Sequence, residues 1–178
     1  ANGAGMSDHG DQLKAAQEAL QRGNFAGGLA RAETLLAHDP KDGDALYVAA
    51  VAARYLDRHD AARSFLERLH AEMPEYGRAW QEAGHLARAR GDKDDALSAY
   101  ARAVRFNPAL TASWTAQAEL LAAMGRTAEA AAAQEQARRV TALPRELVAV
   151  THHLHEGRPL RAEEICRHFL RRNPRHVE

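Results

Sequence analysis

The sequence predicts an all-α protein built from consecutive antiparallel helix pairs, and three observations support this prediction. Alanine, the strongest intrinsic helix former, accounts for 40 of the 178 residues. Val, Ile and Tyr, which favour strands, are scarce. Residues that end helices recur with a period of 34 residues, which is long enough for two helices and their turns.

Three classes of position carry this period. Prolines follow the second helix of each unit, at Pro40, Pro74, Pro108 and Pro174, and Pro144 stands two residues after the expected position. Turn residues within the units are Gly23, Asp57, Gly91, Gly125 and Gly157. Small residues follow at Gly28, Ala62, Ala96, Ala130 and Ala162, and the last unit is two residues shorter than the others.

The five predicted units span residues 9–42, 43–76, 77–110, 111–142 and 143–176. In the third unit, apolar spacing predicts helices over 78–90 and 93–106. Gly91 suits the turn between them, and the second helix ends before Pro108. Gly84 is expected to let the two helix axes approach closely.

The two ends of the chain carry their own predictions. Residues 1–10 are predicted to form a disordered tail or to be an expression remnant, and residues 11–178 a single array. Val177 and Glu178 would begin the first helix of a sixth unit, so we expect the array to be truncated there.

The repeat resembles the tetratricopeptide repeat (TPR) family. The third unit matches its consensus at Trp80, Ala83, Gly84, Ala96, Tyr100, Ala103 and Pro108. The fourth matches at Trp114, Ala118, Leu121, Gly125, Ala130 and Ala137, while Gln134 replaces an aromatic residue. The resemblance implies an all-α, right-handed superhelical solenoid of about five antiparallel helix pairs, with the first helices lining a concave groove.

The resemblance also implies that the groove binds a peptide or protein segment. Helical spacing predicts an inward-facing set made up of Tyr47, Arg54, Tyr55, Arg78, Gln81, His85, Arg88, Thr115 and Glu119. Tyr and Arg are enriched at binding hot spots, and Arg can hold a carboxylate through two parallel hydrogen bonds. The alternative is that these side chains are ordinary solvated residues of a helix face.

Two other functions remain open. In the second half, residues 76–86, 146–158 and 162–178 resemble the N-terminal repeats of bacterial TPR sulfotransferase-like proteins. The resemblance implies that the chain could be the regulatory or substrate-presenting region of a larger enzyme. We expect this segment itself to be non-catalytic and to hold no cofactor, because it lacks the Gly-rich loop that cradles phosphates. A helical-repeat RNA binder is disfavoured, because 24 basic residues balance 24 acidic ones.

Composition narrows the remaining possibilities. No apolar run approaches the length of a membrane span, so no membrane association is expected and a cytoplasmic location is predicted. His152 and His155 share a helix face and could reach one metal ion, but no full ligand set accompanies them, so we predict no metal site. The last helix carries an apolar patch that a following helix would normally cover, and leaving it uncovered predicts self-association through the C-terminal helix pair. The patch consists of Leu160, Ile165, Cys166, Phe169 and Leu170.

Overall fold

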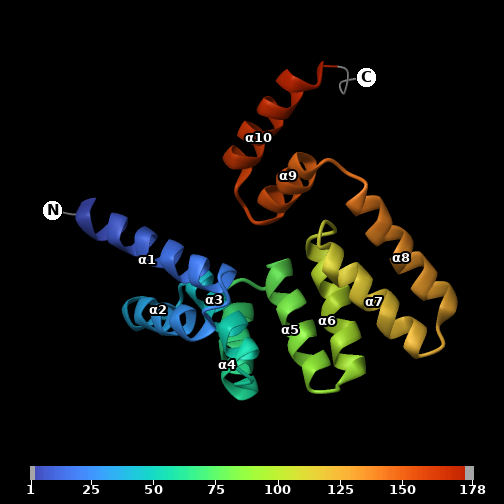
Figure 1. Ribbon diagram of the computed structural model, residues 1–178, viewed down its shortest axis with the longest axis horizontal. Helices are drawn as coiled ribbons and strands as arrows, with labels where there is room; N and C mark the ends of the chain where they lie inside the picture. Colours follow the sequence, from blue (N-terminus) through green and yellow to red (C-terminus); the bar gives the residue numbers. More distant parts are fainter. Residues whose placement is uncertain (1–2, 175–178) are drawn as a thin grey trace. The chain divides into compact units, whose positions relative to one another are not determined.

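The computed structural model describes residues 3–174, with side chains from residue 8 onward, and this range contains ten α-helices and no strand (Figure 1). The helices are α1 (Gly3–Gln21), α2 (Phe25–His38), α3 (Gly43–Tyr55), α4 (His59–Glu72), α5 (Gly77–Ala89), α6 (Lys93–Phe106), α7 (Thr111–Ala123), α8 (Thr127–Thr141), α9 (Arg145–His155) and α10 (Pro159–Arg172). The predicted all-α helical-repeat fold is confirmed.

The turn inside each helix pair has the same backbone conformation. Its φ angle is 76° at Gly23, 56° at Asp57, 83° at Gly91, 75° at Gly125 and 71° at Gly157. This left-handed region is open to Gly and strained for most other residues, which explains why Gly recurs there. The turn register predicted from the sequence is therefore the observed one.

Contacts divide the chain into two compact units, residues 1–75 and 76–178. The sequence predicted a single array over 11–178, and the division falls next to the predicted boundary between its second and third units. We describe each compact unit by itself and call them unit 1 and unit 2.

Unit 1 contains α1–α4, and α3 packs against both α2 and α4. Seven residues of α3 are buried, five of them alanines, so neighbouring helices approach its backbone closely. The helix α1 begins at Gly3 and therefore includes most of the segment predicted to be a disordered tail. Gly10 and Asp11 repeat the residue pair found at the turn after α5, Gly91 and Asp92, but Gly10 lacks the left-handed φ of Gly91 and the helix continues through it.

Unit 2 contains α5–α10, and its best-packed part is the α5–α6–α7 layer (Figure 1). A Cβ added at Gly84 would lie 2.6 Å from the ring of Tyr100, so Gly84 permits the close α5–α6 contact that the sequence predicted. Tyr100 is completely buried, and its cluster includes Ala116 and Leu120 of α7. The same side chain thus fills space within one helix pair and against the next.

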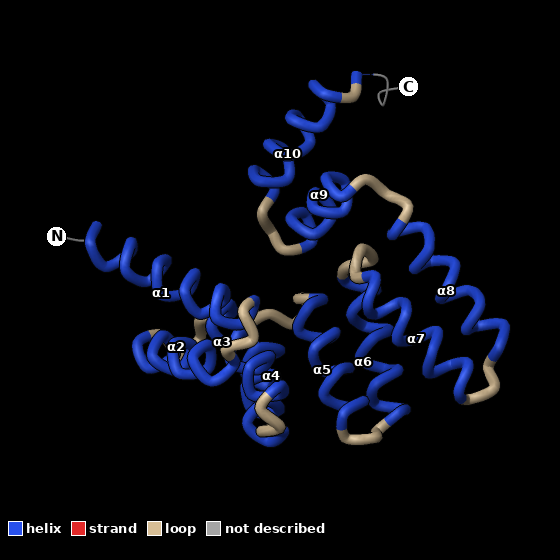
Figure 2. Tube along the Cα trace, in the orientation of Figure 1, coloured by secondary structure: helices blue, strands red, loops and turns tan. Residues whose placement is uncertain are grey.

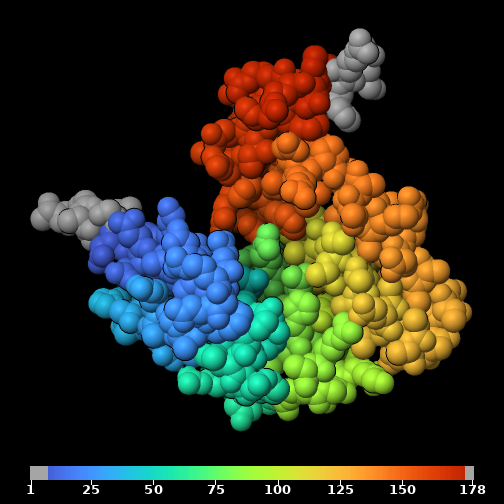
Figure 3. Space-filling model, viewed as in Figure 1, coloured from blue at the N-terminus to red at the C-terminus, as the bar shows by residue number. Residues whose placement is uncertain are grey.

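The α9–α10 pair, which we call the C-terminal hairpin, does not continue this stacking. Its two helices, α9 and α10, pack along each other. Within the described residues, helix α9 does not pack along the preceding helix α8 (Figure 2). In the space-filling view α10 stands clear of α5–α8 (Figure 3). The two missing residues of the fifth repeat are lost from α9, which has 11 residues where α7 has 13.

The outer face of α8 explains why the stacking ends there. Arg138 occupies the register of buried Val104 in α6, and Gln134 that of Tyr100. Both residues are exposed, and hydrogen bonds from Arg138 and Arg139 lower the pKa of Glu135 to about 2. A charged, hydrated face of this kind is typical of the last unit of a repeat array.

Candidate functional site

Four predicted groove residues form a strip along one side of α5, which we call the α5 strip: Arg78, Gln81, His85 and Arg88. The strip borders α7 directly. Gln81 Oε1 accepts a hydrogen bond of 2.8 Å from Ser113 Oγ, and Arg88 Nη2 donates one of 2.7 Å to Glu119 Oε2. The α5 strip and Glu119 of α7 therefore lie side by side, on the first helices of two neighbouring pairs.

The Arg88–Glu119 pair is about half exposed, with side-chain exposures of 49% and 53%. The hydrogen bond to Glu119 raises the pKa of the Arg88 guanidinium above its usual value. Exposed pairs of this kind contribute little to stability because water solvates both charges and salt screens them. An incoming carboxylate can therefore replace Glu119 at small cost.

The orientation of the His85 ring is fixed by a hydrogen bond to a buried residue of α6. Its Nδ1 lies 2.7 Å from the hydroxyl of Tyr100, which is wholly buried. A buried phenol needs a hydrogen-bond partner, so His85 satisfies the Tyr100 hydroxyl while its ring forms part of the α5 strip.

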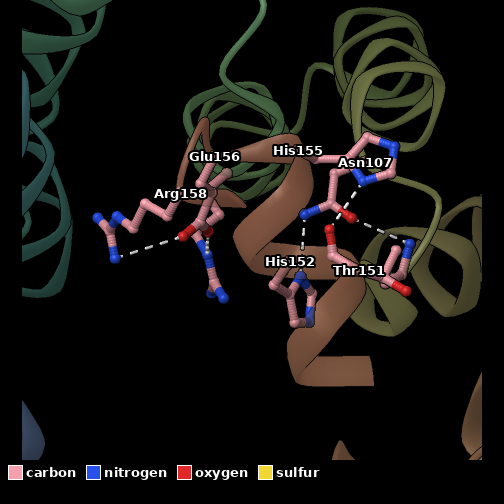
Figure 4. Close-up of polar contacts among 8 residues, drawn as sticks. Asn107, Thr151, His152, His155, Glu156 and Arg158 are labelled. Atoms are coloured by element: carbon pink, nitrogen blue, oxygen red, sulfur yellow. Dashed lines mark hydrogen bonds and ion pairs between the residues drawn. The ribbon is translucent and has the colours of Figure 1, made fainter. Parts of the chain in front are cut away.

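At the N-terminal end of the α5 strip, Arg78 holds a carboxylate of the C-terminal hairpin. Its Nε donates to Glu156 Oε1, and Arg158 Nη1 lies 3.7 Å from the other oxygen of the same carboxylate (Figure 4). The Glu156 side chain is only 8% exposed. Glu156 thus lies between two guanidinium groups, which compensate its loss of hydration.

A second polar contact lies nearby. The Asn107 side-chain oxygen accepts from the backbone N–H of Ala109 at 3.1 Å, which fixes the orientation of the amide. Its Nδ2 therefore donates to His152 Nδ1, 2.9 Å away (Figure 4). Burial, and then the charge of Arg78, lower the pKa of His152 below its usual value, so the neutral ring that accepts this bond is favoured.

The remaining groove residues lie elsewhere. In unit 1, the Tyr55 ring stacks on Phe25 with centroids 4.2 Å apart, the Arg54 guanidinium lies 4.3 Å from the Tyr55 centroid, and Tyr47 is half-buried on the same helix. In unit 2, Thr115 lines a hollow of about 430 Å³ between α7 and α8, together with Gln134 and Arg138.

The histidines considered as metal ligands have other contacts. His152 accepts from Asn107, and His155 Nδ1 lies 2.8 Å from the Thr151 carbonyl oxygen. Among the described residues, no three His, Cys, Asp or Glu side chains are grouped as metal ligands would be. Within the same described range, no helix is both long enough and apolar enough to cross a bilayer.

Three polar residues of unit 2 were missed at the sequence level. Ser113 lies in the first turn of α7, yet it is completely buried and its hydroxyl donates to Gln81 Oε1. Asn107 stands at the end of α6, before Pro108, and its side chain also donates to His152. Glu156 could not be recognised from the repeat pattern, because the same register holds Arg22, Leu56, Arg90 and Met124 in the other four units.

Comparison with protein-family models finds two matches, each described as a tetratricopeptide repeat. One covers residues 19–83 and the other residues 82–146. Comparison with curated protein sequences finds none that matches this chain.

Solved structures agree on the fold. A crystal structure of MamA has a TM-score of 0.67 at 20% identity, over 75% of this chain and 78% of that one. A crystal structure described as MamA protein has a TM-score of 0.63 at 15% identity, over 95% and 93%. TTC0263, a thermophilic TPR protein of Thermus thermophilus, has a TM-score of 0.65 at 22% identity, over 95% and 93%. The chain belongs to the tetratricopeptide repeat family.

Proposed function

We propose that this chain is a non-catalytic protein-interaction scaffold that binds a peptide or protein segment along the α5 strip and the adjoining face of α7. Tetratricopeptide repeats are typically scaffolds of this kind, which supports the general class. The resemblance to sulfotransferase-associated repeats has no further support, and nothing in residues 3–174 favours RNA as the ligand.

One observation carries the proposal. The α5 strip presents two arginines, a glutamine and a histidine in one row, and both arginines already hold carboxylates of this chain. Arg and carboxylate match in geometry, and Arg is frequent at binding hot spots. The strip is therefore suited to a segment that carries acidic side chains or a free C-terminus.

The anchoring of the strip supports the same function. His85 and Gln81 are held by buried partners, Tyr100 and Ser113, on two neighbouring helices. A site whose side chains are already ordered loses less conformational entropy when a ligand binds.

The test begins with peptides selected from a random library on the 178-residue chain, without regard to their charge. Their affinities are then measured for the double variant Gln81→Ala/Arg88→Ala. We expect a loss of about tenfold or more, as for a hot-spot residue. Arg105→Ala, an exposed arginine on α6, is the matched control and should leave the affinity unchanged. Selected peptides that bind the double variant as tightly as the unchanged chain would contradict the proposal.

A further inference from the structure

We infer that Glu156 is an internal ligand: its carboxylate fills a site at Arg78 in the free chain, and an acidic group of a partner takes this site when the C-terminal hairpin moves away. This inference rests on the proposed function. It names the chemistry of the partner and the movement that admits it.

The first step concerns position. Arg78, Gln81, His85 and Arg88 follow one another at intervals of three and four residues, so they share one side of α5. Glu156 binds the first of them and thereby occupies one end of the α5 strip. A partner segment that follows the whole strip must displace it.

The second step compares the two carboxylates on the strip. Glu119 belongs to α7, which is stacked in the repeat layer, and its pair with Arg88 is half exposed. Glu156 belongs to the C-terminal hairpin, which is not stacked on α8, and it is 8% exposed. Of the two, Glu156 is the one carried by a part of the chain that can leave.

The third step concerns how the hairpin is held. None of the described residues of α9 (145–155) is buried, and the linker residue Leu143 is 46% exposed. Polar contacts of Glu156 with Arg78 and of His152 with Asn107 join the hairpin to the repeat layer. Segments with little apolar burial open at low free-energy cost.

The fourth step concerns the charges. When the hairpin opens, Arg78 and Glu156 both regain their hydration, and this offsets much of the attraction lost between them. After the opening, Arg78 no longer holds the Glu156 carboxylate, and the N-terminal end of the α5 strip is accessible to a partner. An acidic segment of a partner supplies a replacement carboxylate there and stabilises the open form by differential binding.

The test measures the binding of a fluorescein-labelled ten-residue peptide of alternating Glu and Gly by fluorescence anisotropy. A second peptide, with Gln in place of Glu, is the reference for charge. Glu156→Gln removes the competing carboxylate, so the Glu peptide should bind about three- to tenfold more tightly, as expected when most of the free chain is closed. Arg78→Gln should weaken the preference for the Glu peptide, and the part that remains is attributed to Arg88. Glu164→Gln makes the same charge change on α10, where Glu164 pairs with Arg161, and should have no effect.

The position of the hairpin is measured independently of binding. Cys166 on α10 is the single cysteine, and a spin label on it can be paired with one on Ser98→Cys, an exposed position of α6. Saturation with the Glu peptide should lengthen and broaden the distance distribution between the two labels. Arg78→Gln and Glu156→Gln should keep the helical circular dichroism of the unchanged chain, which shows that the single variants are still folded.

Three results would overturn the inference. The first is that the Glu peptide binds the unchanged chain and Glu156→Gln with equal affinity. The second is that the label distance is unchanged at saturation. The third is that no chain tested binds the Glu peptide more tightly than the Gln peptide. Each leaves the proposed function standing if library-selected peptides depend on Gln81 and Arg88. A dependence on Arg78 without one on Gln81 and Arg88 would contradict the proposed function instead.

Discussion

The α6–α7 and α8–α9 junctions lie 34 residues apart in the same repeat register, yet only the first of these two stacks one helix pair on the next. At the first, the linker residues Asn107, Ala109 and Leu110 are 2–5% exposed. At the second, the linker residue Leu143, in the register of Ala109, is 46% exposed. Helices of the same repeat family are therefore not sufficient for stacking, and the residues at the junction decide it.

Two local differences account for the contrast. Asn107 ends α6 and binds the Ala109 N–H, which folds the linker into a compact turn. Thr141 stands at the same register in α8, and its hydroxyl donates to the Ala137 carbonyl oxygen at 2.8 Å, so α8 continues one residue further. The outer face of α8 is also polar where that of α6 is apolar.

The largest predicted effect breaks the packed junction. Tyr100→Ala should lower the free energy of unfolding by about 3–5 kcal/mol, because it empties a core site shared by α5, α6 and α7. Gln134→Ala, at the same register of α8, should change it by less than about 0.5 kcal/mol. Urea unfolding of both variants measures the difference, and equal losses would show that α8 is covered as α6 is.

The turns within the helix pairs sharpen the comparison. Gly91→Ala and Gly157→Ala both place a Cβ in the left-handed region, and each should cost about 1 kcal/mol. The cost at Gly91 should appear in the unfolding of the whole α5–α7 layer. The cost at Gly157 should appear only as faster amide exchange in α9 and α10. Faster exchange in α7 of Gly157→Ala would refute the independence of the C-terminal hairpin.

A smaller effect is expected from pH. The folded chain lowers the pKa of His152 below 6.5, so it binds fewer protons than the open form, and docking of the hairpin should weaken as the pH falls through and below that value. The charged groups nearby act in both directions, since Arg78, His153 and His155 lower this pKa and Glu156 raises it.

The label distance between Cys166 and Ser98→Cys measures this effect at about pH 7.5 and at about pH 5.5, on either side of the ordinary histidine pKa. The open fraction should be larger at the lower pH. His152→Gln should remove the change, and a change that persists in this variant would point to another group.

The smallest effect on stability accompanies self-association. Leu160 is 81% exposed on α10, and we propose that a second copy of the chain covers this end. Leu160→Ser should shift light scattering at high concentration toward the monomer while changing the unfolding free energy by less than about 0.5 kcal/mol. An unchanged chain that is monomeric at every concentration would rule the contact out.

Much of the fold could be predicted from the sequence, because its signals are local. The left-handed turn at Gly91 and the close approach at Gly84 each follow from one residue and its spacing. The failure of α9 to stack follows from Gln134, Arg138 and Thr141. Each departs only slightly from the repeat pattern, and their joint effect depends on three-dimensional contacts.

The candidate site was less predictable. Helical spacing placed Arg78 and Arg88 on one side of a helix, but it gave no information on which carboxylates meet them. Glu156 reaches Arg78 over 78 residues of sequence because the hairpin leaves the repeat register. Contacts of this kind depend on tertiary geometry, which spacing within one helix does not contain.

The most direct test of the account is hydrogen exchange followed by mass spectrometry, comparing the amides of α7 with those of α9 at one pH. The account predicts that α9 and α10 exchange together and about tenfold or more faster than α7, because α7 is stacked and α9 is held by polar contacts. Equal protection of α7 and α9 would mean that the repeat layer continues through the last pair, and it would contradict the account.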